Sequence, residues 1–225
     1  MPSRKPRHRR QPKAVPTKFV KLRGKVFNAE RGWRAKVDVR RRVLEALGPA
    51  QTRVFDAYAG PGLMYREVWA QAARYVGCDE TWFKDDRCCF VADNRRVLRC
   101  IDLQAFTCFD FDAFGSPWEQ VLILAARRHL AAGERLGLIL TEGSSIYTRQ
   151  SGLPHAFREA AGLTRAADKG TGRVHDEMIS RALYRTVRRM GGKVVREWWA
   201  NGASAAKMRY IGVVVEGVPH ESASL

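Results

Sequence analysis

Short apolar runs alternate with stretches of helical periodicity through most of the chain. Five of these runs predict buried strands, at residues 52–57, 74–78, 88–92, 106–111 and 136–140. Short apolar strands that alternate with helices form βαβ units, in which helices cover both faces of a parallel sheet. The pattern therefore predicts an α/β fold with a Rossmann-like, doubly wound and mostly parallel sheet.

The helical periodicity locates the covering elements. Helices are predicted at residues 34–47, 63–73, 154–161 and 176–190, with one or two further turns near 82–85. Two last apolar runs, 193–199 and 208–216, are joined by a loop of small residues. They predict an antiparallel strand pair at the C-terminal end of the sheet.

The N-terminal segment has a different composition. Residues 1–17 are rich in Arg, Lys and Pro and hold almost nothing to bury, which predicts a disordered basic tail. Residues 18–225 are predicted to form a single domain, because a chain of 225 residues suits one compact core. Within this domain, residues 19–27 alternate weakly and predict a small hairpin.

The net charge of the chain favours a negatively charged binding partner. It is +17 at neutral pH, an imbalance typical of proteins that bind a polyanion such as nucleic acid. Outside the tail, basic residues cluster on two predicted helices, at Arg40, Arg41 and Arg42 and at Arg181, Arg185, Arg188 and Arg189. We expect the tail and these helices to contact phosphates; a solvated helix face is the alternative for each arginine.

The five cysteines form no recognisable metal or disulfide pattern. Their number is odd, no Cys-x-x-Cys is present and no paired histidines accompany them. Reduced core thiols in a cytoplasmic protein are the simplest account. No apolar stretch has the length of a membrane span, and no apolar segment follows the basic N-terminus as in a secretory signal. The sequence therefore predicts a cytoplasmic protein with no metal site and no membrane segment.

Four of the five apolar runs end beside an acidic residue, and these residues are Asp56, Asp79, Asp93 and Asp112. The carboxyl ends of parallel strands meet at one edge of a sheet, where open α/β folds bind their ligands. We therefore expect the four carboxylates to converge on one rim.

The first of these acids opens a glycine turn, Asp56-Ala57-Tyr58-Ala59-Gly60-Pro61-Gly62. Glycines after a strand let the backbone turn sharply and approach a ligand. A nicotinamide-binding fingerprint would need glycine where this chain has Tyr65, and the Gly-Lys-Ser/Thr of a P-loop is absent. Asp56 suits a ligand with a positive ammonium group better than a pyrophosphate.

The next two acids have less specific surroundings. Asp79 follows Gly60 by nineteen positions, and a carboxylate there can accept the two hydroxyls of a ribose. Asp93, followed by Asn94, can accept a hydrogen bond from an adenine amino group. The cap of the following helix is an equally good interpretation of Asp93.

The fourth acid lies in the most informative segment, residues 110–118. Ser116, Pro117 and Glu119 have the pattern of a helix-capping box, so the start of a helix explains them. It does not explain Asp112, Phe114 and Trp118. A carboxylate beside aromatic rings is suited to an exocyclic base amine, because the carboxylate accepts the amine hydrogens and the rings stack on the base.

These motifs, in this order over residues 52–143, resemble class I S-adenosylmethionine-dependent methyltransferases. Residues 112–117, Asp-Ala-Phe-Gly-Ser-Pro, resemble the Asp-Pro-Phe-Gly-Ser-Pro motif of tRNA guanosine-N2 dimethyltransferases. More distantly they are similar to the Asp-Pro-Pro-Tyr motif of amine-directed DNA and RNA methyltransferases. Ala113 departs from the pattern, because it stands where the family has proline.

The resemblance implies S-adenosylmethionine as cofactor and assigns a role to each matching residue. Asp56, Tyr58, Gly60 and Gly62 would line the methionine part, Asp79 would hold the ribose and Asp93 the adenine. Asp112 would bind the target amine, and Phe114, together with Trp118, would face the base.

The resulting hypothesis is an N-methyltransferase acting on an exocyclic amine of a nucleic-acid base, with RNA favoured over DNA. One alternative is a methyltransferase for a protein or small-molecule amine, which would use the same cofactor motifs. Another is a non-catalytic nucleic-acid-binding protein with a methyltransferase fold. An NAD-dependent oxidoreductase ranks last, because Tyr65 breaks its glycine pattern.

Overall fold

A computed structural model of the protein describes residues 21–22, 25–26, 30–81, 83–144, 152–163, 174–202 and 208–219. The predicted tail, residues 1–17, lies outside the described residues. The hairpin predicted at 19–27 corresponds to a short antiparallel pair, β1 (Lys21–Leu22) and β2 (Lys25–Val26). None of the helices in these ranges is long and apolar enough to cross a membrane.

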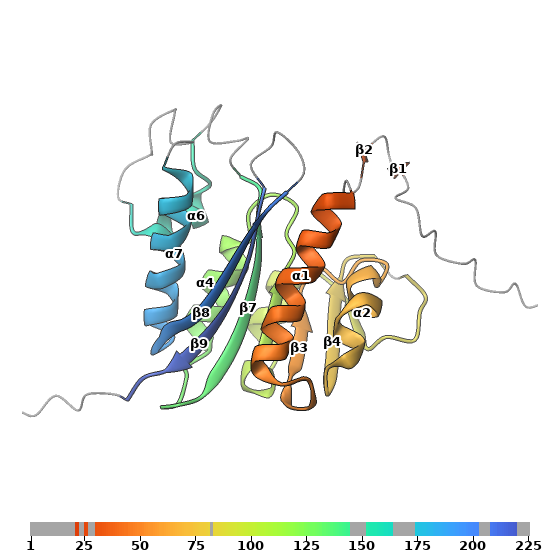
Figure 1. Ribbon diagram of the computed structural model, residues 1–225, viewed down its shortest axis with the longest axis horizontal. Coiled ribbons are helices and arrows are strands. Elements are labelled where there is room, and N and C mark those ends of the chain that lie inside the picture. Colours follow the sequence, from red (N-terminus) through yellow and green to blue (C-terminus); the bar gives the residue numbers. More distant parts are fainter. Residues whose placement is uncertain are drawn as a thin grey trace, which may run out of the picture.

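A seven-stranded sheet forms the centre of the molecule (Figure 1), with the strand order β5-β4-β3-β6-β7-β9-β8. The strands are β3 (Arg53–Asp56), β4 (Arg74–Asp79), β5 (Cys89–Val91), β6 (Cys108–Phe111), β7 (Arg135–Glu142), β8 (Gly192–Asn201) and β9 (Arg209–Gly217). Every pairing is parallel except those of β9, which runs antiparallel to both β7 and β8. The predicted fold class and the C-terminal antiparallel pair are confirmed.

Helices cover both faces of the sheet (Figure 1). One face carries α1 (Glu30–Leu47), α2 (Leu63–Glu67) and the 3-10 turn η2 (Trp69–Gln71). The other carries α3 (Asn94–Cys100), α4 (Trp118–Arg127), α6 (His155–Ala161) and α7 (His175–Arg189). Two further 3-10 turns are η1 (Pro49–Gln51) and η3 (Leu103–Ala105).

Two helical predictions differ from the structure. The helix predicted at 63–73 ends at Glu67, because Val68 leaves the helical region with φ −135° and ψ −58°. The turns predicted near 82–85 are absent from the described residues 83–88. Lys84 has a φ of +57°, a left-handed conformation that no α-helix continues through.

Strand β6 distributes its side chains between the two faces by strict alternation. Phe109 and Phe111 pack into the core beneath α4, whereas Cys108 belongs to the core beneath α1. Asp110, between the two phenylalanines, therefore points towards α1. The same alternation carries Asp112, just past the end of the strand, towards that helix.

A buried ion pair joins α1 to this strand. Arg40 is fully buried and donates from Nε (2.6 Å) and Nη2 (2.7 Å) to the two oxygens of Asp110. Trp69 Nε1 donates to the same carboxylate at 2.9 Å. The prediction that Arg40 contacts phosphate is therefore wrong, because its guanidinium lies in the core. Arg42, by contrast, is half exposed and pairs with Asp38.

Replacing Arg40 by methionine is expected to lower the free energy of unfolding by about 3–5 kcal/mol, because it leaves the Asp110 charge buried without its partner. Arg42→Met, the same change at an exposed pair, should cost less than about 1 kcal/mol. Urea unfolding of both variants measures this. Equal losses in the two variants would contradict a special role of the Arg40–Asp110 pair. A double variant, Arg40→Met with Asp110→Leu, should recover part of the loss.

Candidate cofactor and substrate site

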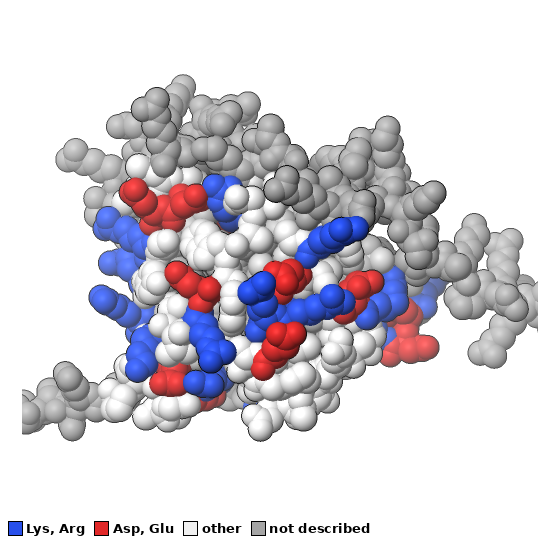
Figure 2. All heavy atoms as spheres, viewed as in Figure 1, with Lys and Arg blue, Asp and Glu red and all other residues white. Residues whose placement is uncertain are grey.

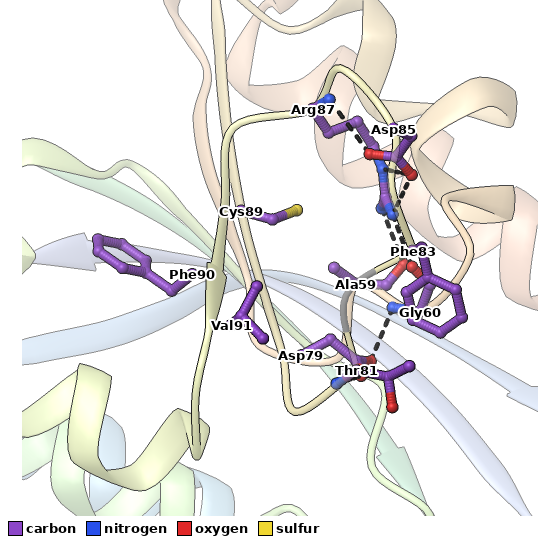
Figure 3. A pocket seen from close by; sticks show the side chains of 10 residues that line it. All are labelled: Ala59, Gly60, Asp79, Thr81, Phe83, Asp85, Arg87, Cys89, Phe90 and Val91. Carbon is purple, nitrogen blue, oxygen red and sulfur yellow. Dashed lines mark hydrogen bonds and ion pairs between the residues drawn. The ribbon is translucent and has the colours of Figure 1, made fainter. Parts of the chain in front are cut away.

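A cleft with a volume of about 410 Å³ opens at the carboxyl ends of β3, β4 and β5. It is lined by Ala57, Tyr58, Asp79, Glu80, Thr81, Ala92, Asp93, Asn94, Arg95 and Gln120. A smaller hollow beside it shares Asp79 and Thr81 (Figure 3). The larger volume falls within the range of about 300–1,000 Å³ that is usual for small-molecule sites. The ends of these parallel strands thus form a cleft of ligand size, and of the four carboxylates expected at one rim Asp79 and Asp93 line it.

Asp56 lies beneath the glycine turn and does not line this cleft. Its side chain is buried and accepts hydrogen bonds from Tyr58 N (3.1 Å) and from the Tyr75 hydroxyl (3.0 Å). Burial, together with the nearby charge of Asp110, raises the pKa of Asp56 to about 7. The role predicted for Asp56, direct contact with a ligand ammonium, is corrected: the residue supports the turn from below.

The glycine turn itself is held by an arginine that the sequence did not indicate. Gly60 and Gly62 have φ of +47° and +76°, values that favour glycine. Arg87 donates to the carbonyl oxygens of Ala59 (3.0 Å) and Gly60 (2.6 Å), and Asp85 orients its guanidinium (Figure 3). A Cβ at Gly62 would lie 2.8 Å from the Arg87 guanidinium, so a larger residue would also have to displace this side chain.

Asp79 stands where the prediction needs a ribose-binding carboxylate. It accepts Gly60 N at 3.0 Å through Oδ2 and Thr81 N at 2.8 Å through Oδ1, which fixes its orientation at the cleft. Each carboxylate oxygen has two acceptor sites, so one site on each remains for a hydroxyl. Asp79 can therefore accept two ribose hydroxyls without losing its structural contacts.

Asp93 is committed to the helix that follows it. It caps α3 by accepting Arg95 N at 2.8 Å, and the Arg95 guanidinium binds both of its oxygens. The hydrogen bonds to Arg95 lower the pKa of Asp93 to about 2. Of the two interpretations left open by the sequence, the structure shows the helix cap. Asp93 also lines the cleft, but adenine would have to compete with Arg95 for it.

Asn94 and Gln120 supply polar groups to the same part of the cleft. Asn94 Nδ2 donates to Ala57 O at 2.8 Å, and Gln120 Nε2 donates to Asn94 Oδ1 at 3.0 Å. Tyr58 is half-buried beside them. Gln120 comes from α4, far along the chain from the strand ends, so no spacing in the sequence connects it with the cleft.

Asp112 and Phe114 follow β6 on the rim. The Asp112 side chain is 21% exposed, and Lys36 Nζ lies 2.8 and 2.9 Å from its two oxygens. Although burial alone would raise the pKa of Asp112, Lys36 and Arg40 hold it below its usual range, so the carboxylate is ionised. Phe114, two residues further, is 74% exposed. The structure thus places an ionised carboxylate and an accessible ring within one short loop.

The role predicted for Trp118, contact with the substrate base, is wrong. It is fully buried and stacks on Phe157, with ring centroids 5.1 Å apart and an angle of 16° between the planes. A ring enclosed in the core cannot face a substrate base. Its place at the start of α4, where the apolar side of the helix meets α6, explains the burial.

The capping box predicted for α4 is also absent. No side chain caps the N-terminus of α4, and the hydroxyl of Ser116 instead lies 3.4 Å from Glu142 Oε2. Glu142, at the end of β7, is fully buried with His175 Nε2 at 3.9 Å. Burial raises the pKa of Glu142 to about 7. The sequence shows an acid at the end of this strand but does not by itself reveal that it is buried.

The architecture is similar to that of solved structures that contain S-adenosylmethionine. Trm1 from Pyrococcus horikoshii, in complex with S-adenosyl-L-methionine, superimposes with a TM-score of 0.58 at 14% identity, covering 85% of this chain and 56% of that chain. TYW2 from M. jannaschii, in complex with AdoMet, gives a TM-score of 0.53 at 10% identity, covering 88% and 85%. The chain thus spans only about half the length of Trm1. No protein-family model and no curated protein matches the sequence.

The seven-stranded sheet, with its single reversed strand β9 between β7 and β8, thus belongs to a fold similar to those of Trm1 and TYW2. The cleft at its rim could hold an adenosyl cofactor of the kind bound in these two structures. The cleft has the required size, Asp79 keeps free acceptor sites, and the turn at Gly60 brings backbone close to the cleft. Asp79 could accept the hydroxyls of a ribose, and Asn94 and Gln120 offer polar groups to the same cleft.

Asp79→Asn is expected to raise the dissociation constant for S-adenosylmethionine at least tenfold, about 1.4 kcal/mol, because one acceptor oxygen is replaced by a donor. Asp86→Asn serves as the control, since Asp86 is an exposed acid in the same loop that lines neither hollow. Isothermal titration calorimetry measures both. An unchanged affinity in Asp79→Asn would show that this carboxylate does not bind the cofactor.

Proposed function

We propose that the protein is an S-adenosylmethionine-dependent N-methyltransferase that modifies an exocyclic amine of a nucleic-acid base, and that the nucleic acid is RNA. The observation that carries this proposal is the loop after β6. There an ionised, partly accessible Asp112 stands two residues from Phe114, which is 74% exposed. The resemblance of residues 112–117 to the motif of tRNA-modifying enzymes favours RNA over DNA.

The chemistry requires little covalent work from the protein. S-adenosylmethionine, when bound, supplies an activated methyl group, so the chain has to align the nucleophile and hold charge. The lone pair of an exocyclic base amine is delocalised into the ring. Hydrogen bonds from that amine to Asp112 localise the lone pair, and stacking on Phe114 fixes the plane of the base.

Asp112→Asn is expected to reduce methyl transfer to RNA by about a hundredfold or more, because it removes the charge that orients the amine. Cofactor affinity should change by less than about twofold, since Asp112 does not line the cleft. Transfer of labelled methyl groups to separate RNA, DNA and protein fractions measures the activity. Asp86→Asn is the control.

The fraction that carries the label distinguishes the proposed function from its alternatives. Label in protein instead of RNA would favour the alternative of a protein amine. A protein that binds S-adenosylmethionine but labels no fraction would favour the non-catalytic alternative. Full activity of Asp112→Asn would refute the assignment of Asp112.

A basic surface is available for the phosphates of such a substrate. Arg181, Arg185, Arg188 and Arg189 lie on the exposed side of α7. Figure 2 shows Lys and Arg side chains gathered on the side of the molecule where α7 lies in Figure 1. Within the described parts of the chain, the side chains of Arg181, Arg188 and Arg189 have no hydrogen-bond or ion-pair partner. Their charge is therefore available to a polyanion.

Replacing Arg181, Arg188 and Arg189 together by glutamine should weaken RNA binding at least tenfold. It should also reduce the slope of log affinity against log salt by about 2, because each lost phosphate contact on a single strand removes about 0.7. Fluorescence anisotropy over a salt series measures both. As a matched pair, Arg188→Gln should weaken binding more than Arg74→Gln, an exposed arginine of β4, which lies near the opposite edge of the sheet from β8, the strand that follows α7. A salt-independent affinity would contradict the proposed partner.

A further inference from the structure

Lys36 occupies the position at Asp112 that a target amine would approach. It extends from α1, its side chain is only 12% exposed, and its ammonium contacts both carboxylate oxygens at 2.8 and 2.9 Å. The ring of Tyr210, on β9, lies 5.5 Å from the ammonium. Lys36 is therefore held in place by Asp112, just after β6, and by Tyr210 on β9, at the centre of the proposed acceptor site.

The charges around this point are already matched. Arg40 neutralises Asp110 in the core and approaches Asp112 to 3.6 Å, while Lys36 neutralises Asp112 on the rim. Two cations thus face two carboxylates before any substrate binds. Tyr210, a titratable side chain that also faces Lys36, stays neutral because burial raises its pKa to about 12.

A neutral site of this kind treats two classes of amine differently. The exocyclic amine of a base is uncharged at neutral pH, so it can donate a hydrogen to Asp112 and share that carboxylate with Lys36. An alkyl amine, such as a lysine side chain, is an ammonium at neutral pH. It would bring a second cation against Lys36, and the like charges repel.

We propose that Lys36 is a specificity-determining residue that makes the acceptor site accept neutral aromatic amines and reject alkylammonium groups. This inference rests on the proposed function, because it takes Asp112 as the group that binds the target amine. It assigns to α1, which lies outside the motifs that suggested that function, a direct part in the choice of substrate.

The test uses two small amines of similar shape and different charge. Benzylamine is an ammonium at neutral pH, whereas aniline is uncharged. Each is added as a competitor of methyl transfer to RNA in the wild-type protein, in Lys36→Met, in Lys36→Arg and in Lys193→Met. Lys193, an exposed lysine of β8, controls for the loss of one positive charge far from Asp112.

The expected result is a gain of benzylamine inhibition in one variant. Relative to aniline, benzylamine should bind at least tenfold better to Lys36→Met than to the wild type, because the competing cation is gone. Lys36→Arg and Lys193→Met should keep the wild-type ratio. Ligand-observed NMR on the protein saturated with S-adenosylhomocysteine gives the same ratio without turnover, in case Lys36→Met transfers no methyl group.

An equal ratio in all four proteins would overturn the role of Lys36 while leaving the proposed function intact. A wild-type protein that binds S-adenosylmethionine and methylates no nucleic acid would instead refute the proposed function, and the inference with it. A ratio that changes equally in Lys193→Met would attribute the effect to overall charge and would also overturn the inference.

Discussion

Two cations on α1 and two carboxylates at the end of β6 form a charge ladder, in which Lys36 binds Asp112 and Arg40 binds Asp110. The spacings of the two elements make this possible. Four residues of a helix advance about 6 Å, and two residues of a strand advance about 6.6 Å. Because these distances match, both ion pairs can form at the same time. A shift of α1 by one residue along the strand would break both, so the ladder fixes the register of the helix on the sheet.

The two ion pairs lie at different depths: Arg40 and Asp110 are buried in the core, and Asp112 is partly exposed. Removing Arg40 and Asp110 from water costs several kcal/mol per ion, and the cost is offset only where all the polar groups are satisfied. Here two guanidinium nitrogens and the indole of Trp69 donate to Asp110. The Lys36–Asp112 pair, in which Asp112 is 21% exposed, lies at the boundary between the core and the rim. The acceptor carboxylate of the proposed site is thus oriented by the same interaction that positions α1.

The sequence predicted the parts of the molecule that depend on local pattern. The fold class follows from the alternation of apolar runs and helices, and Asp79 and Asp112 could be placed at the rim because strand ends converge. The roles given to Asp56 and Trp118 were wrong, and for Asp93 the structure shows the helix cap of the two interpretations, since each role depends on whether a side chain points into the cleft, the core or a helix end. The burial of Arg40 could have been predicted from the sequence. Arg40 falls at helical spacing from Val37 and Leu44, on the apolar side of α1, and therefore points into the core.

Other residues were beyond prediction, because their partners are distant in the chain. Arg87 supports the glycine turn from 27 positions away, and Gln120 reaches Asn94 across 26. Neither contact has a characteristic spacing, and each exists only once the strands are side by side. An arginine or glutamine of this kind looks like any surface residue in the sequence.

Ala113 shows how such contacts can replace a motif residue. A proline would restrict the backbone after Asp112 but has no N–H group. Ala113 has one, and it donates to Phe111 O at 2.8 Å, which closes a tight turn around Asp112. The far end of the loop is held from β7, because Gly143 N donates to Gly115 O at 2.6 Å and Glu142 accepts from Ser116. Hydrogen bonds on both sides thus restrain the loop that carries Asp112 and Phe114, so the departure from proline does not by itself leave the acceptor group unfixed.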